Sequence, residues 1–145
     1  MTAELDESHQ SLMRDSFASQ TMMETIGARI ATIKKGHVEI AAPILPGTKQ
    51  QNGYGHAALT FALGDTAAGY AAISALQPGW NVLTAEIKIN LLAPARGAEL
   101  RATGRVIKPG RRLVVVSSDI HAIDDQGSET LIAVMQGTMI PFAPE

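Results

Sequence analysis

The chain has 145 residues, of which 14 are acidic and 12 basic, and its net charge is -2. One domain of this length can bury about two thirds of the surface that its unfolded chain exposes. Hydrophobic residues make up 46% of the chain and charged ones 18%, which is a globular composition. The near-neutral charge argues against nucleic acid as a partner. The absence of cysteine excludes disulfides, thiolate nucleophiles and cysteine metal sites.

Neither a targeting peptide nor a membrane segment is predicted. The first fifteen residues, MTAELDESHQSLMRD, are polar and acidic, unlike a signal or transit peptide. No apolar run reaches the roughly 18 residues of a membrane span. We therefore expect a single domain over residues 1–145 in the cytoplasm, with neither membrane nor nucleic acid as a partner.

The first predicted elements are a helix and two strands. Apolar residues over 4–26 form a loose helical face that stops at Gly27, so residues 1–26 predict an N-terminal helical extension. The runs ARIATI (28–33) and HVEIAAPI (37–44) predict strands joined by the turn KKG, as in a hairpin. The turn-rich loop PGTKQQNGYG follows them.

A long helix is predicted next, over HAALTFALGDTAAGYAAISAL (56–76). This segment contains no proline, and about 20 residues make a helix near 30 Å long. Beyond it the period changes to two, so in TAEIKINLLAP one face should carry Thr84, Glu86, Lys88 and Asn90. Strands are also predicted in ELRATGRVI, RLVVVSSDIHAI and TLIAVMQGTMI, and the last four strands are expected to form an antiparallel meander.

An antiparallel sheet with a single apolar face needs a cover, and the helix over 56–76 is the one predicted element long enough to supply it. Small side chains on that helix permit close approach of the sheet. We therefore predict an α+β fold, in which about six antiparallel strands within residues 27–142 wrap around one long central helix.

The central helix carries one acid, Asp65, that its neighbours do not explain. Asp is a poor residue in mid-helix, and Gly64 and Gly69 nearby each cost about 1 kcal/mol relative to Ala. Two glycines and an acid indicate a spot that something approaches closely; the alternative is a solvent-facing polar stripe. The residues three and four positions from the acid are all uncharged: Phe61, Ala62, Ala68 and Gly69.

The start of the central helix is a second candidate. The N–H groups near His56, Ala57 and Ala58 have no partner within the helix, and the helix dipole adds about half a positive charge there. Such an end can hold an oxygen that becomes an anion. Ala57 and Asp65 are eight residues apart, about 12 Å along one axis, so one chain cannot place both on the same carbonyl. Two antiparallel helices across a two-fold interface could do so, with two shared sites per dimer.

Other patterns in the sequence give weaker indications of function. GYGHAA (53–58) formally matches the dinucleotide fingerprint, but that fingerprint requires a buried strand directly before it, and here the preceding residues are GTKQQN. An exposed polar face is the favoured interpretation of three residues that alternate along one strand: Ser117, Asp119 and His121. A charged turn or a phosphate contact would each explain the basic cluster Lys108, Arg111 and Arg112. Pocket walls or core would each explain the aromatic residues Phe61, Tyr70 and Trp80.

Three segments, in this order, carry a resemblance to a known family: GYGHAALTFALGDTAAGYAA, VLTAEIKINLLAPARGAELRATGRVIKPGRRL and LIAVMQGTM. Together they resemble the PaaI-type branch of the hotdog-fold acyl-CoA thioesterases, over residues 27–140. The resemblance implies a long helix wrapped by an antiparallel sheet, and two chains joined edge to edge, often as a dimer of dimers. It also implies that coenzyme A enters as part of the substrate, with no separate cofactor and no metal.

The resemblance implies roles for individual residues. Asp65, nine residues after the histidine, takes the place of the helix acid that acts as general base or nucleophile. His56 matches the family's histidine, but Ala57 and Ala58 replace the two glycines that follow it, the first of which polarises the thioester carbonyl through its N–H. Gln50 stands where the family has Asn or Gln as a partner of the carbonyl or the attacking water.

Further substrate contacts are expected at Asn52 beside Gln50, at Gly69 near the acid, and at Thr84, where related enzymes have a hydroxyl near the water. The nucleotide part of coenzyme A is expected toward Arg111 or Arg112. The leading hypothesis is an acyl-CoA thioesterase that hydrolyses an aryl- or acyl-CoA thioester at a site shared across the dimer interface.

A non-catalytic acyl-CoA binding or sensing module is the alternative to an enzyme, because the HAA sequence departs from the family's loop. A dehydratase is disfavoured, because it would pair a histidine with an acid. His56 and Asp65 lie about 180° apart around the predicted helix.

Overall fold

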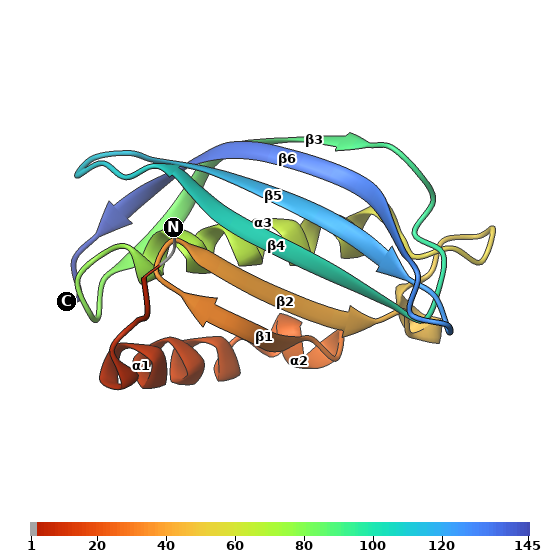
Figure 1. Ribbon diagram of the computed structural model, residues 1–145, viewed down its shortest axis with the longest axis horizontal. Helices are drawn as coiled ribbons and strands as arrows, with labels where there is room; N and C mark the ends of the chain where they lie inside the picture. The colour runs from red at the N-terminus through yellow and green to blue at the C-terminus, as the bar shows by residue number, and fades with distance from the viewer. Residues whose placement is uncertain (1–2) are drawn as a thin grey trace.

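The fold is one antiparallel sheet wrapped around one long helix, α3, with two short helices at the N-terminus (Figure 1). The computed structural model describes residues 3–145. Along the sheet the strand order is β1-β2-β4-β5-β6-β3. The elements are α1 (Glu7–Ala18), α2 (Thr21–Thr25), β1 (Arg29–Lys34), β2 (His37–Pro43), η1 (Pro46–Thr48), α3 (Ala57–Ser74), β3 (Asn81–Leu91), β4 (Glu99–Lys108), β5 (Val114–Ile123) and β6 (Glu129–Phe142). The predicted α+β fold is confirmed.

The sheet approaches α3 very closely, because glycines stand at the points of contact. A methyl group on Gly104 of β4 would overlap the backbone of α3 at Ala67. One on Gly64 of α3 would lie 2.9 Å from Cδ1 of Ile120 and closer still to Sδ of Met135, on β5 and β6. What comes close to Gly64 is therefore the sheet, so packing alone explains one of the two mid-helix glycines.

The predicted N-terminal helix is confirmed, but it does not run unbroken over residues 4–26, because the chain breaks at Ser19 and Gln20 into α1 and α2. The N–H of Ser19 bonds back to the carbonyl oxygens of Asp15 and Ser16, and its hydroxyl also bonds to Ser16. Gln20 then takes an extended conformation before α2. Side chains that bond to nearby carbonyls compete with helix continuation in this way. α1 packs toward α3, where the ring of Phe17 lies edge-on to that of Tyr70 with the two ring centroids 5.8 Å apart.

The meander predicted for the last four strands is correct only for β4, β5 and β6. β3 pairs with β6 and forms an edge of the sheet, since β2 already occupies the free side of β4. The exposed side chains of β3 fit this edge position, with Leu83 67% and Leu91 55% exposed. An exposed apolar edge strand is a surface on which another strand can pair.

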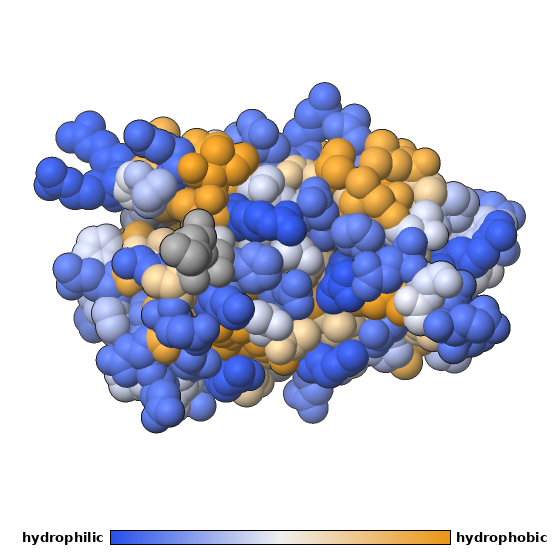
Figure 2. Space-filling model, viewed as in Figure 1, coloured by the Kyte–Doolittle hydropathy of each residue, from blue (hydrophilic) through white to orange (hydrophobic). Residues whose placement is uncertain are grey.

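The outer face of the sheet, directed away from α3, is mostly hydrophilic, as Figure 2 shows, with hydrophobic areas near its upper border. Asp119 accepts a hydrogen bond from Arg105 at 3.1 Å on this face. Ser117, Asp119 and His121 alternate with buried residues along β5, which confirms the predicted polar face. Within residues 3–145 no helix is both long and apolar enough to cross a membrane.

Candidate active site

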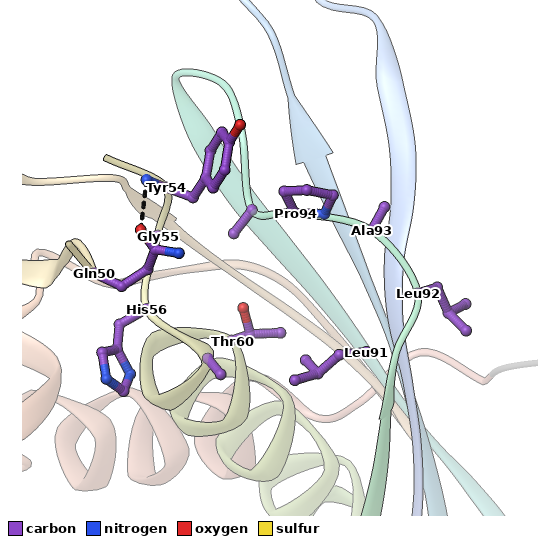
Figure 3. A pocket seen from close by; sticks show the side chains of 11 residues that line it. Gln50, Tyr54, Gly55, His56, Thr60, Leu91, Leu92, Ala93 and Pro94 are labelled. Atoms are coloured by element: carbon purple, nitrogen blue, oxygen red, sulfur yellow. Dashed lines mark hydrogen bonds between the residues drawn. The ribbon is translucent and has the colours of Figure 1, made fainter. Parts of the chain in front are cut away.

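A cleft of about 540 Å³ opens where α3 begins. Figure 3 shows Gln50, Tyr54 and Thr60 on one side of it and Leu91, Leu92 and Pro94 on the other. We call it the helix-start cleft, and it brings together three of the predicted site residues. It is lined by Gln50, Tyr54, Gly55, His56, Ala57, Thr60 and the segment 91–95.

The side chain of Gln50 shapes the loop before α3. Its Oε1 accepts a hydrogen bond from the N–H of Asn52 at 2.5 Å. The same oxygen accepts the N–H of Tyr54 at 3.3 Å, the bond drawn in Figure 3. Gly55 then donates its N–H to the carbonyl oxygen of Ala95 at 2.8 Å, and a side chain at Gly55 would press on Ala95. Since Oε1 is engaged in the loop, what Gln50 offers to a ligand in the cleft is its amide N–H.

Of the three N–H groups expected at the helix start, one is free. His56 donates its own N–H to the carbonyl oxygen of Thr48 at 2.9 Å. Its ring Nδ1 accepts the N–H of Ala58 at 2.8 Å, which caps the helix and places the ring proton on Nε2. The N–H of Ala57 has no partner within residues 3–145. This N–H, at the positive end of the helix dipole, is the donor available to a carbonyl oxygen.

Asp65 lies in a different cleft, of about 350 Å³, which we call the carboxylate cleft. Thr84 donates its hydroxyl to Oδ1 of Asp65 at 2.7 Å. Oδ2 of this half-buried carboxylate has no partner within residues 3–145. The carboxylate is thus held by one oxygen and can react through the other. The cleft is lined by Ser16, Ser19, Gln20, Asp65, Thr66, Gly69, Tyr70, Ile73, Asn81, Val82 and Thr84.

A β-bulge turns Thr84 toward Asp65. Thr84 pairs with Met139 of β6 and Glu86 pairs with Thr138, so the register shifts between Thr84 and Glu86. Met139 is fully buried beneath the sheet, and Thr84 faces the same side. The predicted alternation, which placed Thr84 on one face with Glu86, is therefore wrong at this position. Bulges commonly redirect a side chain in this manner beside functional sites.

Packing does not account for Gly69, the second glycine of α3. A methyl group there would lie 3.7 Å from Cγ2 of Val82 and 4.0 Å from Cε of Met139, which are ordinary contact distances. Alanine would fit, and it would favour the helix. The missing side chain instead leaves the carboxylate cleft open at Gly69, one turn beyond Asp65.

The remaining predicted residues lie outside these two clefts. Asn52 is exposed in the loop and lines neither. Arg111 lines a third cleft, of about 460 Å³, beyond the C-terminal end of α3 with Trp80, and Arg112 does not line it. A role for either arginine toward coenzyme A stays a prediction.

Sequence reasoning missed Tyr54 and Arg96, which meet at the rim of the helix-start cleft. Arg96 donates Nη2 to the hydroxyl of Tyr54 at 2.9 Å and stacks over its ring at 5.1 Å. The two residues are 42 positions apart, so no local pattern could reveal the pair. No group of three or more His, Asp and Glu side chains suited to a metal ion occurs in the described part of the chain.

The sequence pattern of the thioesterase superfamily matches residues 52–129, from the loop before α3 to the start of β6. The chain belongs to this superfamily. Both clefts lie largely within the matched region, since Ala57, Asp65 and Thr84 are all inside it.

Two relatives of this thioesterase-superfamily chain are described as hydrolases. A candidate esterase of Saccharolobus solfataricus is 32% identical over 117 residues, which is 81% of this chain and 75% of that protein. A 1,4-dihydroxy-2-naphthoyl-CoA hydrolase of Listeria monocytogenes is 29% identical over 90 residues, 62% of this chain and 73% of that protein.

Solved structures agree on the fold. A thioesterase family protein from Silicibacter pomeroyi is 40% identical, with a TM-score of 0.90 over 93% of this chain and 98% of that chain. The Escherichia coli PaaI protein is 19% identical, with a TM-score of 0.83 over 97% of this chain and 98% of that chain, which shows a common fold. The resemblance to PaaI-type hotdog proteins is confirmed.

Proposed function

We propose that the protein is an acyl-CoA thioesterase whose site is shared by two copies of the chain. One copy supplies Asp65, and the other supplies Gln50 and the N–H of Ala57. The observation that carries the proposal is the division of these groups between two clefts, about 12 Å apart along α3. A reaction that uses both needs a second copy, with the two α3 helices antiparallel across a two-fold axis.

The edge strand β3 supports such a pairing. Its outer edge has no partner strand within residues 3–145, and Leu83, Leu91 and Leu92 expose more than half of their surface along or just beyond it. Two β3 strands joined antiparallel would cover this edge and continue the sheet from one copy into the next. Asp65 contacts β3 through Thr84, so it lies near the proposed interface.

The geometry suits thioester hydrolysis. The carbonyl oxygen of the thioester accepts the free N–H of Ala57 and an amide N–H of Gln50, which stabilise the negative charge that develops on it. Oδ2 of the other copy's Asp65 takes a proton from water, whose oxygen bonds to the carbonyl carbon. The carbon–sulfur bond then breaks, and the coenzyme A thiolate receives the proton.

Attack by Asp65 itself would give the same products through an anhydride. A single turnover in ¹⁸O-labelled water separates the two routes. A general base leaves the carboxylate unlabelled and puts the label in the free acid. A nucleophile leaves the label in Asp65 once water attacks the aspartyl side of the anhydride.

The direct test is thiol release from a panel of aryl- and aliphatic-CoA thioesters. Asp65→Asn should lower turnover at least about a hundredfold, the scale for loss of a positioned acid–base group. Asp119→Asn is the matched control, since Asp119 bonds to Arg105 on the outer face. An Asp65→Asn variant that retains wild-type turnover would exclude the proposed role.

A non-catalytic acyl-CoA binding module is the second candidate. It is favoured by Ala57 and Ala58, which place two methyl groups where the family has glycines. The same panel separates the candidates: binding of acyl-CoA without any thiol release by the wild type would select the binding module.

Complementation tests whether the site is shared. Asp65→Asn and Gln50→Ala chains are each expected to be impaired, and a mixed dimer would contain one intact site and one doubly altered site. If subunits exchange at random, half of the dimers are mixed, and activity should return to about a quarter of the wild-type value. No recovery after exchange would indicate that each site belongs to one chain.

A further inference from the structure

The turn that carries Gln50 is closed by its own hydrogen bonds. Gln50 donates its N–H to the carbonyl oxygen of Tyr54 at 2.8 Å, and Gly53 donates its N–H to that of Gln50 at 3.0 Å. Gly53, with φ at 86°, allows the chain to reverse here. Residues 51–53 are exposed, so solvent surrounds the tip of the turn. These local bonds fix the shape of the turn without fixing its position relative to the rest of the fold.

Two contacts anchor this turn to the segment that follows β3. The backbone contact is at the buried Gly55, which donates its N–H to the carbonyl oxygen of Ala95 at 2.8 Å. The side-chain contact joins the next residue of each segment, Tyr54 and Arg96. Nη2 of Arg96 donates to the hydroxyl of Tyr54 at 2.9 Å, and the guanidinium carbon lies 5.1 Å from the ring centroid. The side-chain pair thus reinforces the backbone pair.

No acid accounts for the position of the Arg96 side chain. Among residues 3–145 no carboxylate lies within ion-pair distance of it, whereas Arg29, Arg101 and Arg105 each pair with an acid. A cation over an aromatic ring is attracted by the electrons of the ring face, and the bond to the hydroxyl fixes its orientation. The guanidinium is therefore committed to Tyr54, which lies 42 positions away in the chain.

Tyr54 is bonded directly to Gln50. Its N–H donates to Oε1 of Gln50 at 3.3 Å, and its carbonyl oxygen accepts the N–H of Gln50 (Figure 3). A movement of Tyr54 therefore carries Gln50 with it. Both residues line the helix-start cleft together with Ala57, and Arg96 does not. A donor stabilises a developing charge best when it is already in position, because reorganisation during the reaction costs free energy.

We propose that Arg96 and Tyr54 form a clasp that positions Gln50, with Arg96 acting through Tyr54 and without touching the substrate. This inference rests on the proposed thioesterase function and deepens it. The clasp holds the turn over residues 50–54 against the segment that follows β3. The amide N–H of Gln50 and the N–H of Ala57 then face the same carbonyl oxygen. Without the clasp, the turn keeps its shape but leaves this position part of the time.

The first test is the steady-state kinetics of Arg96→Ala with the best thioester. We expect kcat to fall about fivefold, the scale of an exposed cation–π contact with its hydrogen bond, while KM stays within about twofold. Arg96→Lys keeps a cation for the ring and should recover part of kcat. Tyr54→Phe removes only the hydroxyl and should lose less than Arg96→Ala. A raised KM with unchanged kcat would mean that Arg96 contacts coenzyme A directly, and would overturn the inference.

A double-mutant cycle tests whether the clasp acts through Gln50. In the Gln50→Ala background, Arg96→Ala should lower kcat by less than about twofold, because the donor that the clasp positions is already absent. Equal losses in the two backgrounds would overturn the inference. Arg105→Ala is the matched control, since Arg105 is also exposed and bonds to Asp119 on the outer face at 3.1 Å. It should leave kcat unchanged.

Amide hydrogen exchange separates this inference from the proposed function. The N–H of Gly55 joins the turn to Ala95, so it should exchange about fivefold faster in Arg96→Ala than in the wild type. The N–H of Val106, which bonds to the carbonyl oxygen of Gly36, should exchange at the same rate in both. Faster exchange at Gly55 supports the clasp even if no thioester is hydrolysed and the proposed function fails. Unchanged exchange at Gly55 overturns the clasp and leaves the proposed function to be decided by thiol release.

Discussion

Replacing Gly69 by alanine should stabilise the fold and impair catalysis. Alanine is favoured over glycine in a helix interior by about 1 kcal/mol. The added methyl would make only ordinary contacts, 3.7 Å from Val82 and 4.0 Å from Met139. The free energy of unfolding should therefore rise by about 0.5–1 kcal/mol. The same methyl would enter the carboxylate cleft, so kcat/KM for the best thioester should fall.

Gly64→Ala is the matched comparison on the same helix. The gain in helix propensity is the same, but the methyl would lie 2.9 Å from Cδ1 of Ile120 and closer still to Met135, both of which are buried. Overpacking of a core costs about 1–3 kcal/mol. The net result is a loss of up to about 2 kcal/mol, so the two variants should differ by about 1–3 kcal/mol.

Urea unfolding followed by circular dichroism measures both stabilities, at one protein concentration because association would shift the transition. Thiol release measures activity on the same preparations. If Gly64→Ala proves as stable as Gly69→Ala, the close approach of the sheet to α3 is refuted. If Gly69→Ala keeps full activity, the reaction does not need the space that Gly69 leaves in the carboxylate cleft.

Three further changes test single contacts. Thr84→Val removes the donor to Asp65, so kcat should fall roughly tenfold with little change in KM. Hydrogen bonds to charged groups contribute about 1.5–3 kcal/mol, and less when they are exposed. Unchanged steady-state kinetics would contradict this prediction. His56→Ala should lower the free energy of unfolding by about 0.5–2 kcal/mol through loss of the helix cap, and His56→Asn should retain most of it; equal urea midpoints for the two variants would refute the cap. Burial lowers the pKa of His9, opposed by the charge of Asp6, so the unfolded chain binds this proton more readily. The stability linked to His9 should be complete above about pH 6.5 and fall as the pH drops toward the lowered pKa of the folded state. His9→Leu should flatten that decline in unfolding experiments, and an unchanged slope would argue against it.

Local sequence patterns were enough to predict the central helix and the strands of the sheet. The central helix predicted over 56–76 is observed as Ala57–Ser74, because an uninterrupted run of small and apolar residues forms a helix from contacts within four positions. The hairpin of β1 and β2 was found for the same kind of reason, since strand periodicity and the turn KKG are local. The break at Ser19 was missed, because apolar periodicity does not detect the bond from the Ser19 hydroxyl to the carbonyl oxygen of Ser16.

The order of the strands could not be predicted from periodicity. β3 and β6 are separated by two other strands in the chain, and their pairing depends on which edges remain free after β2 has joined β4. The bulge that turns Thr84 toward Asp65 follows from that pairing. A period of two predicts faces within a strand and says nothing of where the register shifts.

The features of the site also divide into those that the sequence predicted and those that only the tertiary structure shows. The sequence was enough to identify Asp65, Gln50 and Ala57 as candidates. The acid lies in an otherwise apolar helix, Ala57 lies at a predicted helix start, and the family resemblance indicates Gln50. The capping bond from Ala58 to His56 and the bonds to Oε1 of Gln50 are themselves local, within four positions of the chain. The wall that Ser16 and Gln20 add beside Asp65, in contrast, depends on contacts between distant segments. Those contacts exist only once the chain has folded, so the tertiary structure alone reveals them.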